Sequence, residues 1–508
     1  MLENFLAGSQ ALFGDPFTIG IFVFGVLGGM LFGAIPGVSM LTLAAILLPF
    51  TANLEPAQGV MLFAVIYCTG TYGGAITAIL FNIPGAPENA PTAFDGYPMT
   101  QQGKSGKAVG AAVLCSAIGG VASALVMMAA TEPLAQWAIR NIGPPEIFAL
   151  VFFGLAVASS VGARTVWKGW ISVLLGLMIA TIGQDPVGGI NRYNFGFSDL
   201  AAGIAFVPAI LGFFAVSEIF VQADKRTSGQ FKSPKLGMSF PTIFELWAHK
   251  IAVVRSILVG FFCGILPGIG ATLAAFMGYG EAVRWSRNRK EFGKGKLEGV
   301  ISSETANNAA TGAAIIPLLA LGLPGGALTA MMVAVFQMHD LEPGPLVFYN
   351  SPDLIWVVFA AMFYANLSIL VIGLLETKTI LYLLKIPFPF LAPMILLLAA
   401  IGSYIGRGLV LDVVVMFAAG IIGFLLRRSG YSIPGLVLGI ILGKIGEQNF
   451  AQGMQMVHYD LLEYFSRPIC SILILLGILT LLSGVYKALK PSRSLSSANW
   501  TGSSAGQK

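Results

Sequence analysis

The sequence GMLFGAIPGVSMLTLAA, from Gly29 to Ala45, interrupts an apolar run with the pair Pro36-Gly37. A second stretch, GFFCGILPGIGATLAA, runs from Gly260 to Ala275. The two stretches align without a gap, so that Gly29, Gly33, Pro36, Gly37 and Ala44 match Gly260, Gly264, Pro267, Gly268 and Ala275. This repetition indicates that the chain contains two related halves.

The composition is that of a membrane protein. Of the 508 residues, 56% are hydrophobic and only 10% are charged, whereas a soluble domain has about 25% charged residues. Most of the chain consists of apolar runs long enough to cross a bilayer, joined by short polar segments. We therefore predict an all-α polytopic membrane protein with roughly 11 to 14 membrane segments. The four cysteines lie singly in apolar surroundings, and their spacing predicts neither a metal site nor a disulfide framework.

The distribution of Lys and Arg predicts the topology. No basic residue precedes Lys104, and basic clusters occur at 225–250, 284–296 and 427–428. Because cytoplasmic loops are enriched in Lys and Arg, these clusters and the C-terminus should be cytoplasmic, and the N-terminus should lie on the outer side of the membrane. Topology alone accounts for these short loops, so we do not predict nucleic-acid binding.

The two broken segments should enter the membrane from opposite sides. Residues 17–53 are flanked by acidic residues and 251–283 by basic ones, and each is too long for one crossing. Each is therefore predicted to form a Pro-Gly-broken helical hairpin in one of two inverted-topology repeats, a recurring plan of secondary transporters. The predicted divisions are a first membrane repeat at 1–223, a cytoplasmic linker at 224–250, a second repeat at 251–490 and a disordered cytoplasmic tail at 491–508.

Two further alignments favour this division. The sequence Asn82-Ile-Pro-Gly matches Gly322-Leu-Pro-Gly, which pairs Pro84 with Pro324. Pro145, Ala156, Ser159 and Gly162 likewise match Pro389, Ala400, Ser403 and Gly406 without gaps.

The four breaks predict a central anion site. A Pro-Gly break inside a bilayer frees backbone groups, which must be satisfied by protein, water or a ligand. In transporters, half-helix N-termini face anionic substrates and unwound carbonyls coordinate Na⁺. The alternative is that each break is only a kink or a tight turn. The candidate substrate-binding residues are Gly37, Ser39, Thr42, Asn82, Gly85, Gly268, Gly270, Thr272, Asn308, Thr311 and Gly325.

A polar segment, Ser302-Ser-Glu-Thr-Ala-Asn-Asn-Ala-Ala-Thr311, opens a predicted membrane helix. Glu304, Asn307, Asn308 and Thr311 are spaced so that they share one helix face. We predict that Glu304 and Asn307 couple transport to Na⁺ or H⁺. The alternative is that Ser302 or Ser303, with Glu304, forms an ordinary N-terminal cap.

Enzymatic chemistry is not predicted. Gly103-Lys104-Ser105 ends like a phosphate-binding loop, but the position that requires the first glycine of that motif is Pro98. The sequence shows no pattern typical of a catalytic triad and no spacing typical of zinc ligands. No cofactor is expected apart from the coupling ion.

The motifs resemble those of the large membrane subunit, TctA type, of tripartite tricarboxylate transporters, over nearly the whole chain. The shared motifs are Gly-x3-Gly-x2-Pro-Gly at Gly29 and at Gly260, Asn82-Ile-Pro-Gly, Phe94-Asp-Gly-Tyr-Pro-Met99, Glu304-x2-Asn-Asn-Ala, Gly322-Leu-Pro-Gly and Pro343-Gly-Pro. The resemblance implies a location in the bacterial inner membrane, with a periplasmic N-terminus. It also implies uptake of a carboxylate that a periplasmic binding protein delivers, driven by an ion gradient, with a small membrane subunit as partner. Ser39 departs from the family pattern, which has glycine there.

The sequence thus predicts a secondary active carboxylate transporter subunit that works by symport. The alternatives are a scaffold subunit whose partner transports, a passive anion channel and, less favoured, a membrane-embedded enzyme. The sequence leaves open which carboxylate is carried, the choice between Na⁺ and H⁺, and the oligomeric state.

Overall fold

The computed structural model describes residues 1–35, 38–159, 165–185, 188–224, 241, 243–266, 270–383 and 388–489. Within this part the regular structure is helical, except for one antiparallel ladder that pairs Gly183 of β1 (Gly183–Gln184) with Arg192 of β2 (Asn191–Arg192). The predicted all-α class is therefore confirmed. Most of the predicted linker at 224–250 and all of the predicted tail at 491–508 lie outside the described residues.

The first half of the described chain contains ten α-helices. They are α1 (Leu2–Gly14), α2 (Pro16–Ala34), α3 (Met40–Leu47), α4 (Pro56–Phe81), α5 (Ala90–Gln101), α6 (Ser105–Asn141), α7 (Pro144–Ala158), α8 (Val166–Ala180), α9 (Phe206–Ile210) and α10 (Ser217–Asp224). Short 3₁₀ turns follow α3 (η1, Leu48–Asn53) and precede α5 (η2, Pro87–Asn89) and α9 (η3, Ser198–Leu200), and a π-helical turn joins α9 to α10 (η4, Leu211–Val216).

The second half of the described chain contains thirteen α-helices. They are α11 (Ile243–Ala248), α12 (Lys250–Ile265), α13 (Gly270–Trp285), α14 (Leu297–Ala313), α15 (Ile315–Leu321), α16 (Ala327–Met338), α17 (Val347–Asn350), α18 (Pro352–Leu383), α19 (Phe388–Ile405), α20 (Val410–Arg428), α21 (Ile433–Met456), α22 (Leu461–Ser466) and α23 (Pro468–Leu489), with a 3₁₀ turn before α14 (η5, Arg289–Glu291).

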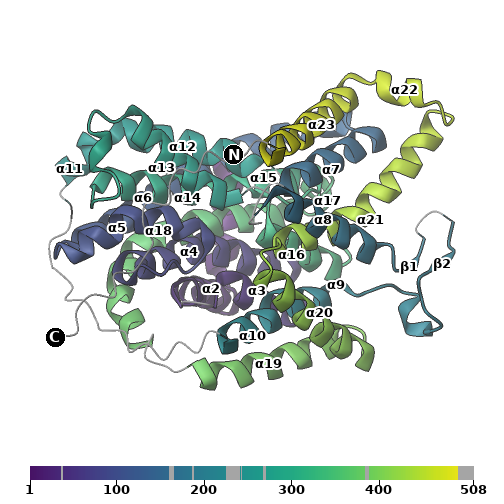
Figure 1. Cartoon of the computed structure of the whole chain (residues 1–508), viewed down its shortest axis with the longest axis horizontal. Helices are drawn as coiled ribbons and strands as arrows, with labels where there is room; N and C mark the ends of the chain where they lie inside the picture. The colour runs from purple at the N-terminus through teal and green to yellow at the C-terminus, as the bar shows by residue number, and fades with distance from the viewer. Residues whose placement is uncertain are drawn as a thin grey trace.

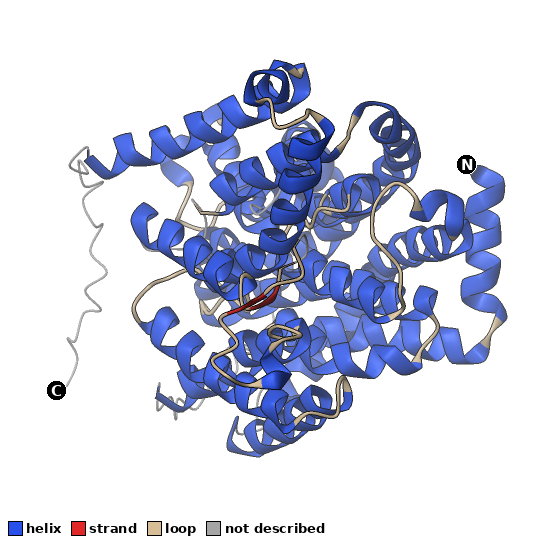
Figure 2. Cartoon of the chain, turned by 90° about the vertical axis from the view of Figure 1, so that its right-hand side faces the viewer, coloured by secondary structure: helices blue, strands red, loops and turns tan. Residues whose placement is uncertain are grey.

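Helix α4 lies in the interior of the molecule. Its apolar stretch is wholly buried, and it packs against α2, α5, α6, α14, α16 and α18. The other helices surround this interior, and the β1–β2 ladder projects at one end of the long axis (Figures 1 and 2). A helix that is apolar on every side needs such surroundings, because no face of it is suited to water.

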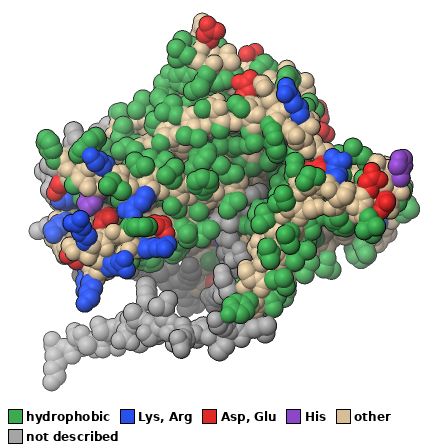
Figure 3. Space-filling view, turned by 90° about the horizontal axis from the view of Figure 1, so that it is seen from above, with side chains coloured by type: hydrophobic (Ala, Val, Ile, Leu, Met, Phe, Trp, Pro, Cys, Tyr) green, Lys and Arg blue, Asp and Glu red, His purple; other side chains and the backbone are tan. Residues whose placement is uncertain are grey.

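The chain is a multi-pass membrane protein. Seven helical stretches of the described chain are long and apolar enough to cross a bilayer: α2, α4, α6, the run from α9 to α10, α18, α20 and α23. Five shorter apolar helical stretches accompany them. One face of the molecule carries hydrophobic side chains across its middle and a gathering of Lys and Arg at its left end (Figure 3). This surface matches the hydrocarbon layer of a bilayer between two aqueous phases.

Ion pairs and hydrogen bonds join charged residues that are far apart in the sequence. Lys107 forms an ion pair with Glu245, and Arg467 forms one with Glu146 at 2.5 Å. Arg192 binds Glu447 through two hydrogen bonds of 2.6 and 3.0 Å, and these bonds raise the pKa of the Arg192 guanidinium. The positive charge of Arg192 is thus balanced locally.

Both long apolar segments are interrupted where the sequence predicts. Helix α2 ends at Ala34 and α3 begins at Met40, while α12 ends at Ile265 and α13 begins at Gly270. The predicted site residues Gly37 and Gly268 lie outside the described residues, as do Pro36 and Pro267.

The repeated glycines make equivalent close contacts. A methyl group on Gly33 would lie 2.2 Å from the carbonyl oxygen of Gly70 in α4. A methyl group on the matching Gly264 would lie 2.6 Å from that of Ala310 in α14. Since α2 packs on α4 and α12 packs on α14, both halves use a glycine to bring two helices into close contact.

The second pair of breaks also has matching geometry. Asn82 ends α4 and Gly322 ends α15, and both adopt the left-handed conformation, with φ of 58° and 74°. The next amide donates back to Thr77 in the first half (3.3 Å) and to Pro317 in the second (3.1 Å). This is the bonding of a Schellman-type helix end, which stops the 26-residue α4 and the seven-residue α15.

Two helices of the first half were not predicted. Helix α1 precedes the first apolar run, and Asp15 separates it from α2 by capping α2, with Thr18 N donating at 2.8 Å. The hydrogen bonds from Thr18 lower the pKa of Asp15. The second is helix α5, which contains Pro98 and lies between two of the apolar segments.

Candidate functional site

Helix α14 carries the polar side chains that the sequence singles out. Its residues from Glu298 to Ala313 are all buried, and it packs against α4, α5, α6, α12 and α13. Polar side chains in such a position need partners from the surrounding helices. The contacts of α14 therefore define the candidate site.

Glu304 is the best-connected of these side chains. Thr92 Oγ1 from α5 donates to one carboxylate oxygen, and Ser116 Oγ from α6 donates to the other at 3.0 Å. The Thr92 hydroxyl also lies 2.9 Å from that of Ser303. Three helices thus converge on a carboxyl group that has no exposed surface.

The capping interpretation of Glu304 is wrong. Helix α14 begins at Leu297, so Ser302, Ser303 and Glu304 lie in its second and third turns, where the backbone amides are already bonded within the helix. Glu304 therefore has no orphan amide to cap.

A second acidic residue, Glu88, approaches from η2, which follows the break at Pro84-Gly85. It is 6% exposed and lies close enough to Glu304 for the two carboxyl groups to interact electrostatically. Thr272 Oγ1, in the first turn of α13, lies 3.5 Å from Glu88 Oε2. A segment of the first half, η2, thus contacts a broken helix of the second half, α13.

Amide side chains complete this polar group. Asn89 Nδ2 donates to Thr71 O of α4 at 2.8 Å, while its oxygen has no hydrogen-bond partner among the described residues. The side-chain oxygens of Asn307 and Asn308 lack partners there too, as does the Asn307 amide nitrogen. Asn308 Nδ2 donates to Glu304 O at 3.1 Å. Thr311 Oγ1 bonds its own helix and lies 3.8 Å from Cys68 Sγ of α4. We call the group formed by Glu88, Asn89, Thr92, Ser116, Thr272, Glu304, Asn307 and Asn308 the polar centre.

The other predicted residues lie around this centre. Gly270, at φ 53°, begins α13, and a methyl group on it would lie 3.9 Å from Gly325 O. Gly325 packs against Ala314, and Gly85 packs against Gly33 O and Gly74. Asn82 is exposed and serves as a helix end.

Ser39 and Thr42 belong to α3, which packs against α2, α4 and α16. Ser39 occupies the N-cap position of α3, yet its hydroxyl makes no capping hydrogen bond. Thr42 is buried. The connection of α3 to the polar centre is indirect: Met40 Sδ lies 3.7 Å from Thr71 Oγ1, and Thr71 O accepts from Asn89.

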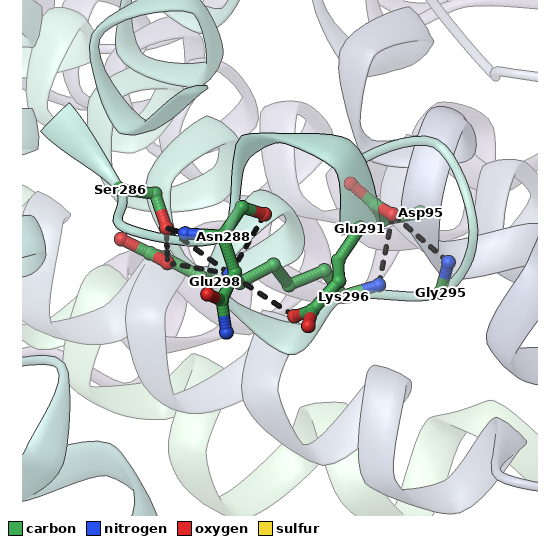
Figure 4. Close-up of polar contacts among 7 residues, drawn as sticks. All are labelled: Asp95, Ser286, Asn288, Glu291, Gly295, Lys296 and Glu298. Carbon is green, nitrogen blue, oxygen red and sulfur yellow. Dashed lines mark hydrogen bonds and ion pairs between the residues drawn. The ribbon is translucent and has the colours of Figure 1, made fainter. Parts of the chain in front are cut away.

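Asp95 of α5 fixes the start of α14 (Figure 4). Its Oδ1 accepts from the amides of Gly295 (2.9 Å) and Lys296 (2.8 Å), and its Oδ2 accepts from Tyr279 (2.9 Å). A carboxylate at a helix N-terminus is stabilised by the free amides and by the helix dipole. Asp95 thus anchors the helix that carries Glu304.

We expect Asp95→Ala to destabilise the protein by about 3 kcal/mol or more, because three partly buried donors lose a charged, buried acceptor. Unfolding by SDS titration in mixed micelles measures the loss. Asp353→Ala, at an exposed position in the first turn of α18, is the matched control and should change the stability by less than about 0.5 kcal/mol. Equal stabilities of the two variants would contradict the anchoring role of Asp95.

Several residues of the polar centre were missed as site residues by sequence reasoning. Glu88 and Asn89 follow the break at Pro84-Gly85 within a few residues. Their position after this break was the signal that could have identified them. Thr92 and Ser116 carry no such signal, since a hydroxyl in an apolar helix usually bonds its own backbone.

Comparison with known proteins agrees with this architecture. The sequence model of the tripartite tricarboxylate transporter TctA family matches residues 19–438. An Agrobacterium vitis protein described as an uncharacterized 52.8 kDa protein in the TAR-I ttuC' 3'region is 35% identical over 476 residues, which cover 92% of this chain and 93% of that protein. A second A. vitis protein, described as an uncharacterized protein in the TAR-II ttuC' 3'region, is 34% identical over 234 residues, or 46% of this chain and 97% of its own length.

No solved structure matches the chain. The resemblance that the motifs indicate is confirmed, since the family model covers most of the chain and the first relative covers nearly all of it. The chain belongs to the tripartite tricarboxylate transporter TctA family.

Proposed function

We propose that this chain is the transporting subunit of a tripartite system and imports a carboxylate across the bacterial inner membrane, driven by a Na⁺ or H⁺ gradient. The observation that carries the proposal is the polar centre: buried carboxyl, amide and hydroxyl groups lie where a broken helix of one half meets the post-break segment of the other. Family membership supports a transport role and argues against an enzyme.

Two inverted halves form the framework of this proposal. Matched helix ends at Asn82 and Gly322 and matched glycine contacts at Gly33 and Gly264 support it. The contacts between halves are also reciprocal, since η2 packs on α13 and α16 packs on α3. In this plan the N-terminus is periplasmic and the C-terminus cytoplasmic.

Helix N-termini and neutral donors would hold the substrate. None of the ion pairs in the described chain lies in the polar centre. The first turns of α3 and α13 offer free backbone N–H groups and the positive ends of helix dipoles, which suit an anion. Ser39 and Thr272 add a hydroxyl donor at each of these two ends.

The family context supports two partners, a small membrane subunit and a periplasmic solute-binding protein that delivers the carboxylate. Within this chain, Glu304 and Asn307 are the proposed coupling residues. Their burial and their place between three helices would make ion binding sensitive to the relative position of the halves.

The double variant Ser39→Ala with Thr272→Ala should transport at least about tenfold more slowly and remain folded, because two hydroxyl donors to an anion are worth about 1.5–3 kcal/mol together. Uptake of the carboxylate retained by the cognate binding protein is the measurement. The control pair Thr480→Ala with Ser483→Ala removes hydroxyls from exposed positions on α23. Wild-type uptake kinetics in the first double variant would refute this part of the proposal.

A further inference from the structure

Two buried carboxyl groups of the polar centre lack a basic partner. Glu304 has no exposed surface and Glu88 only 6%. The ion pairs of the described chain involve other carboxylates, including Glu146 with Arg467 and Asp412 with Arg407. Burying a negative charge is costly unless a positive charge accompanies it, and two neighbouring carboxylates add their mutual repulsion. A cation bound between the two carboxyl groups would offset this cost.

An unpartnered amide side chain accompanies these carboxyl groups. Asn89, directly after Glu88, is held against α4, where its nitrogen donates to Thr71 O and its oxygen lies against Gly74. Asn89 thus positions Glu88 and supplies no free oxygen. Asn307 stands three residues after Glu304, on the same face of α14, and both of its polar atoms are unpartnered among the described residues. Asn89 and Asn307 are both fully buried.

We propose that Glu88, Glu304 and Asn307 form a sodium-ion site. A proton would satisfy one acceptor, whereas an alkali-metal ion accepts several oxygen ligands at once. Carboxylate and amide oxygens are the hard donors that such cations prefer.

The surrounding hydroxyls act as positioning groups. Thr92 and Ser116 each donate to one Glu304 oxygen, and Thr272 lies within hydrogen-bonding reach of Glu88. Each carboxylate oxygen keeps lone pairs for a metal after accepting one hydrogen bond. These contacts hold the carboxyl groups in place for a cation.

Sodium binding at this site would depend on how the two halves of the chain are placed relative to each other. Glu88 comes from η2 of the first half, and Glu304 and Asn307 come from α14 of the second. A cation held by both segments favours the arrangement in which they meet, by as much as its affinity differs between the arrangements. This coupling role rests on the proposed transport function, whereas the binding of sodium does not.

Thermal unfolding of the purified full chain in detergent tests the binding. NaCl should raise the melting temperature in a saturable way, while KCl and choline chloride at the same concentration should not, because specific binding to the native state stabilises it. Binding of ²²Na⁺ in a scintillation-proximity assay measures the affinity directly. An equal rise of the melting temperature with all three salts would overturn the proposal, and so would the absence of saturable ²²Na⁺ binding.

Substitutions locate the site. Glu304→Gln, Glu88→Gln and Asn307→Ala should each weaken ²²Na⁺ binding about tenfold or more, since even outer-shell changes cost metal sites 10–100-fold. Glu146→Gln is the matched control: it neutralises a buried glutamate that has an arginine partner and should keep wild-type sodium affinity. If one variant does not fold, the other two decide the question.

Wild-type sodium affinity in the folded variants would contradict the site. Stabilisation by acid alone, without sodium, would replace the metal ion by a proton and also overturn the proposal. Failure of carboxylate uptake with sodium binding intact would instead refute the transport function and leave the site standing.

Discussion

Glu304→Gln should reduce gradient-driven carboxylate uptake about 30- to 100-fold while the protein stays folded. The amide has nearly the shape of the carboxyl group, and its oxygen still accepts a hydrogen bond from Thr92, while the Ser116 hydroxyl can accept from the amide nitrogen. The negative charge is lost, and with it a charge-assisted interaction with the coupling cation of about 2–3 kcal/mol. Initial rates in proteoliposomes, normalised to folded protein, measure the effect.

Glu298→Gln is the matched control on the same helix. Glu298 lies in the first turn of α14, beside Lys296 and Ser286 (Figure 4), and its neutralisation should leave uptake within about twofold of wild type, as expected for a change of a few tenths of a kcal/mol. Full uptake in Glu304→Gln would reduce Glu304 to a structural hydrogen-bonding residue of α14.

Gly33→Ala should cause the largest loss of stability among single methyl additions in α2. The new methyl group would lie 2.2 Å from Gly70 O and 2.9 Å from Gly70 C, both backbone atoms of the innermost helix. Because α4 is buried on all sides, it cannot move away without disturbing the helices behind it. Overpacking of this kind costs about 1–3 kcal/mol or more.

Gly20→Ala provides the control within the same helix, since nothing lies within 4 Å of a methyl group there. Helix propensity favours alanine over glycine, so Gly20→Ala should be neutral or slightly stabilising. SDS-induced unfolding of both variants gives the comparison. If Gly33→Ala were as stable as Gly20→Ala, α2 and α4 would not be in the close contact described.

The sequence predicted the helical framework because hydrophobic length and charge act locally. The breaks after Ala34 and Ile265 and the helix ends at Asn82 and Gly322 follow from glycine and proline, whose backbone preferences need no tertiary context. Helix α5 was missed for the complementary reason: it is polar and contains Pro98, and its stability comes from packing against α4, α6 and α14.

Only the part of the candidate site that α14 contributes was predictable from the sequence. The helical spacing of Glu304, Asn307 and Asn308 places them on one face without any knowledge of neighbours. That Glu88 would face them, and that Asp95 rather than Ser302 would serve the start of α14, depends on contacts between residues about 200 positions apart in sequence. No local pattern encodes such a pairing.

The most direct test of the account is accumulation of labelled carboxylate by proteoliposomes that contain this chain, its small membrane subunit and the periplasmic binding protein. With an inward Na⁺ or H⁺ gradient, we expect the internal concentration to exceed the external one, and the excess to vanish when the gradient is dissipated or when this chain is omitted. Equilibration without accumulation would indicate a passive channel. Equal accumulation in the absence of this chain would indicate a scaffold, and either result would contradict the proposed function.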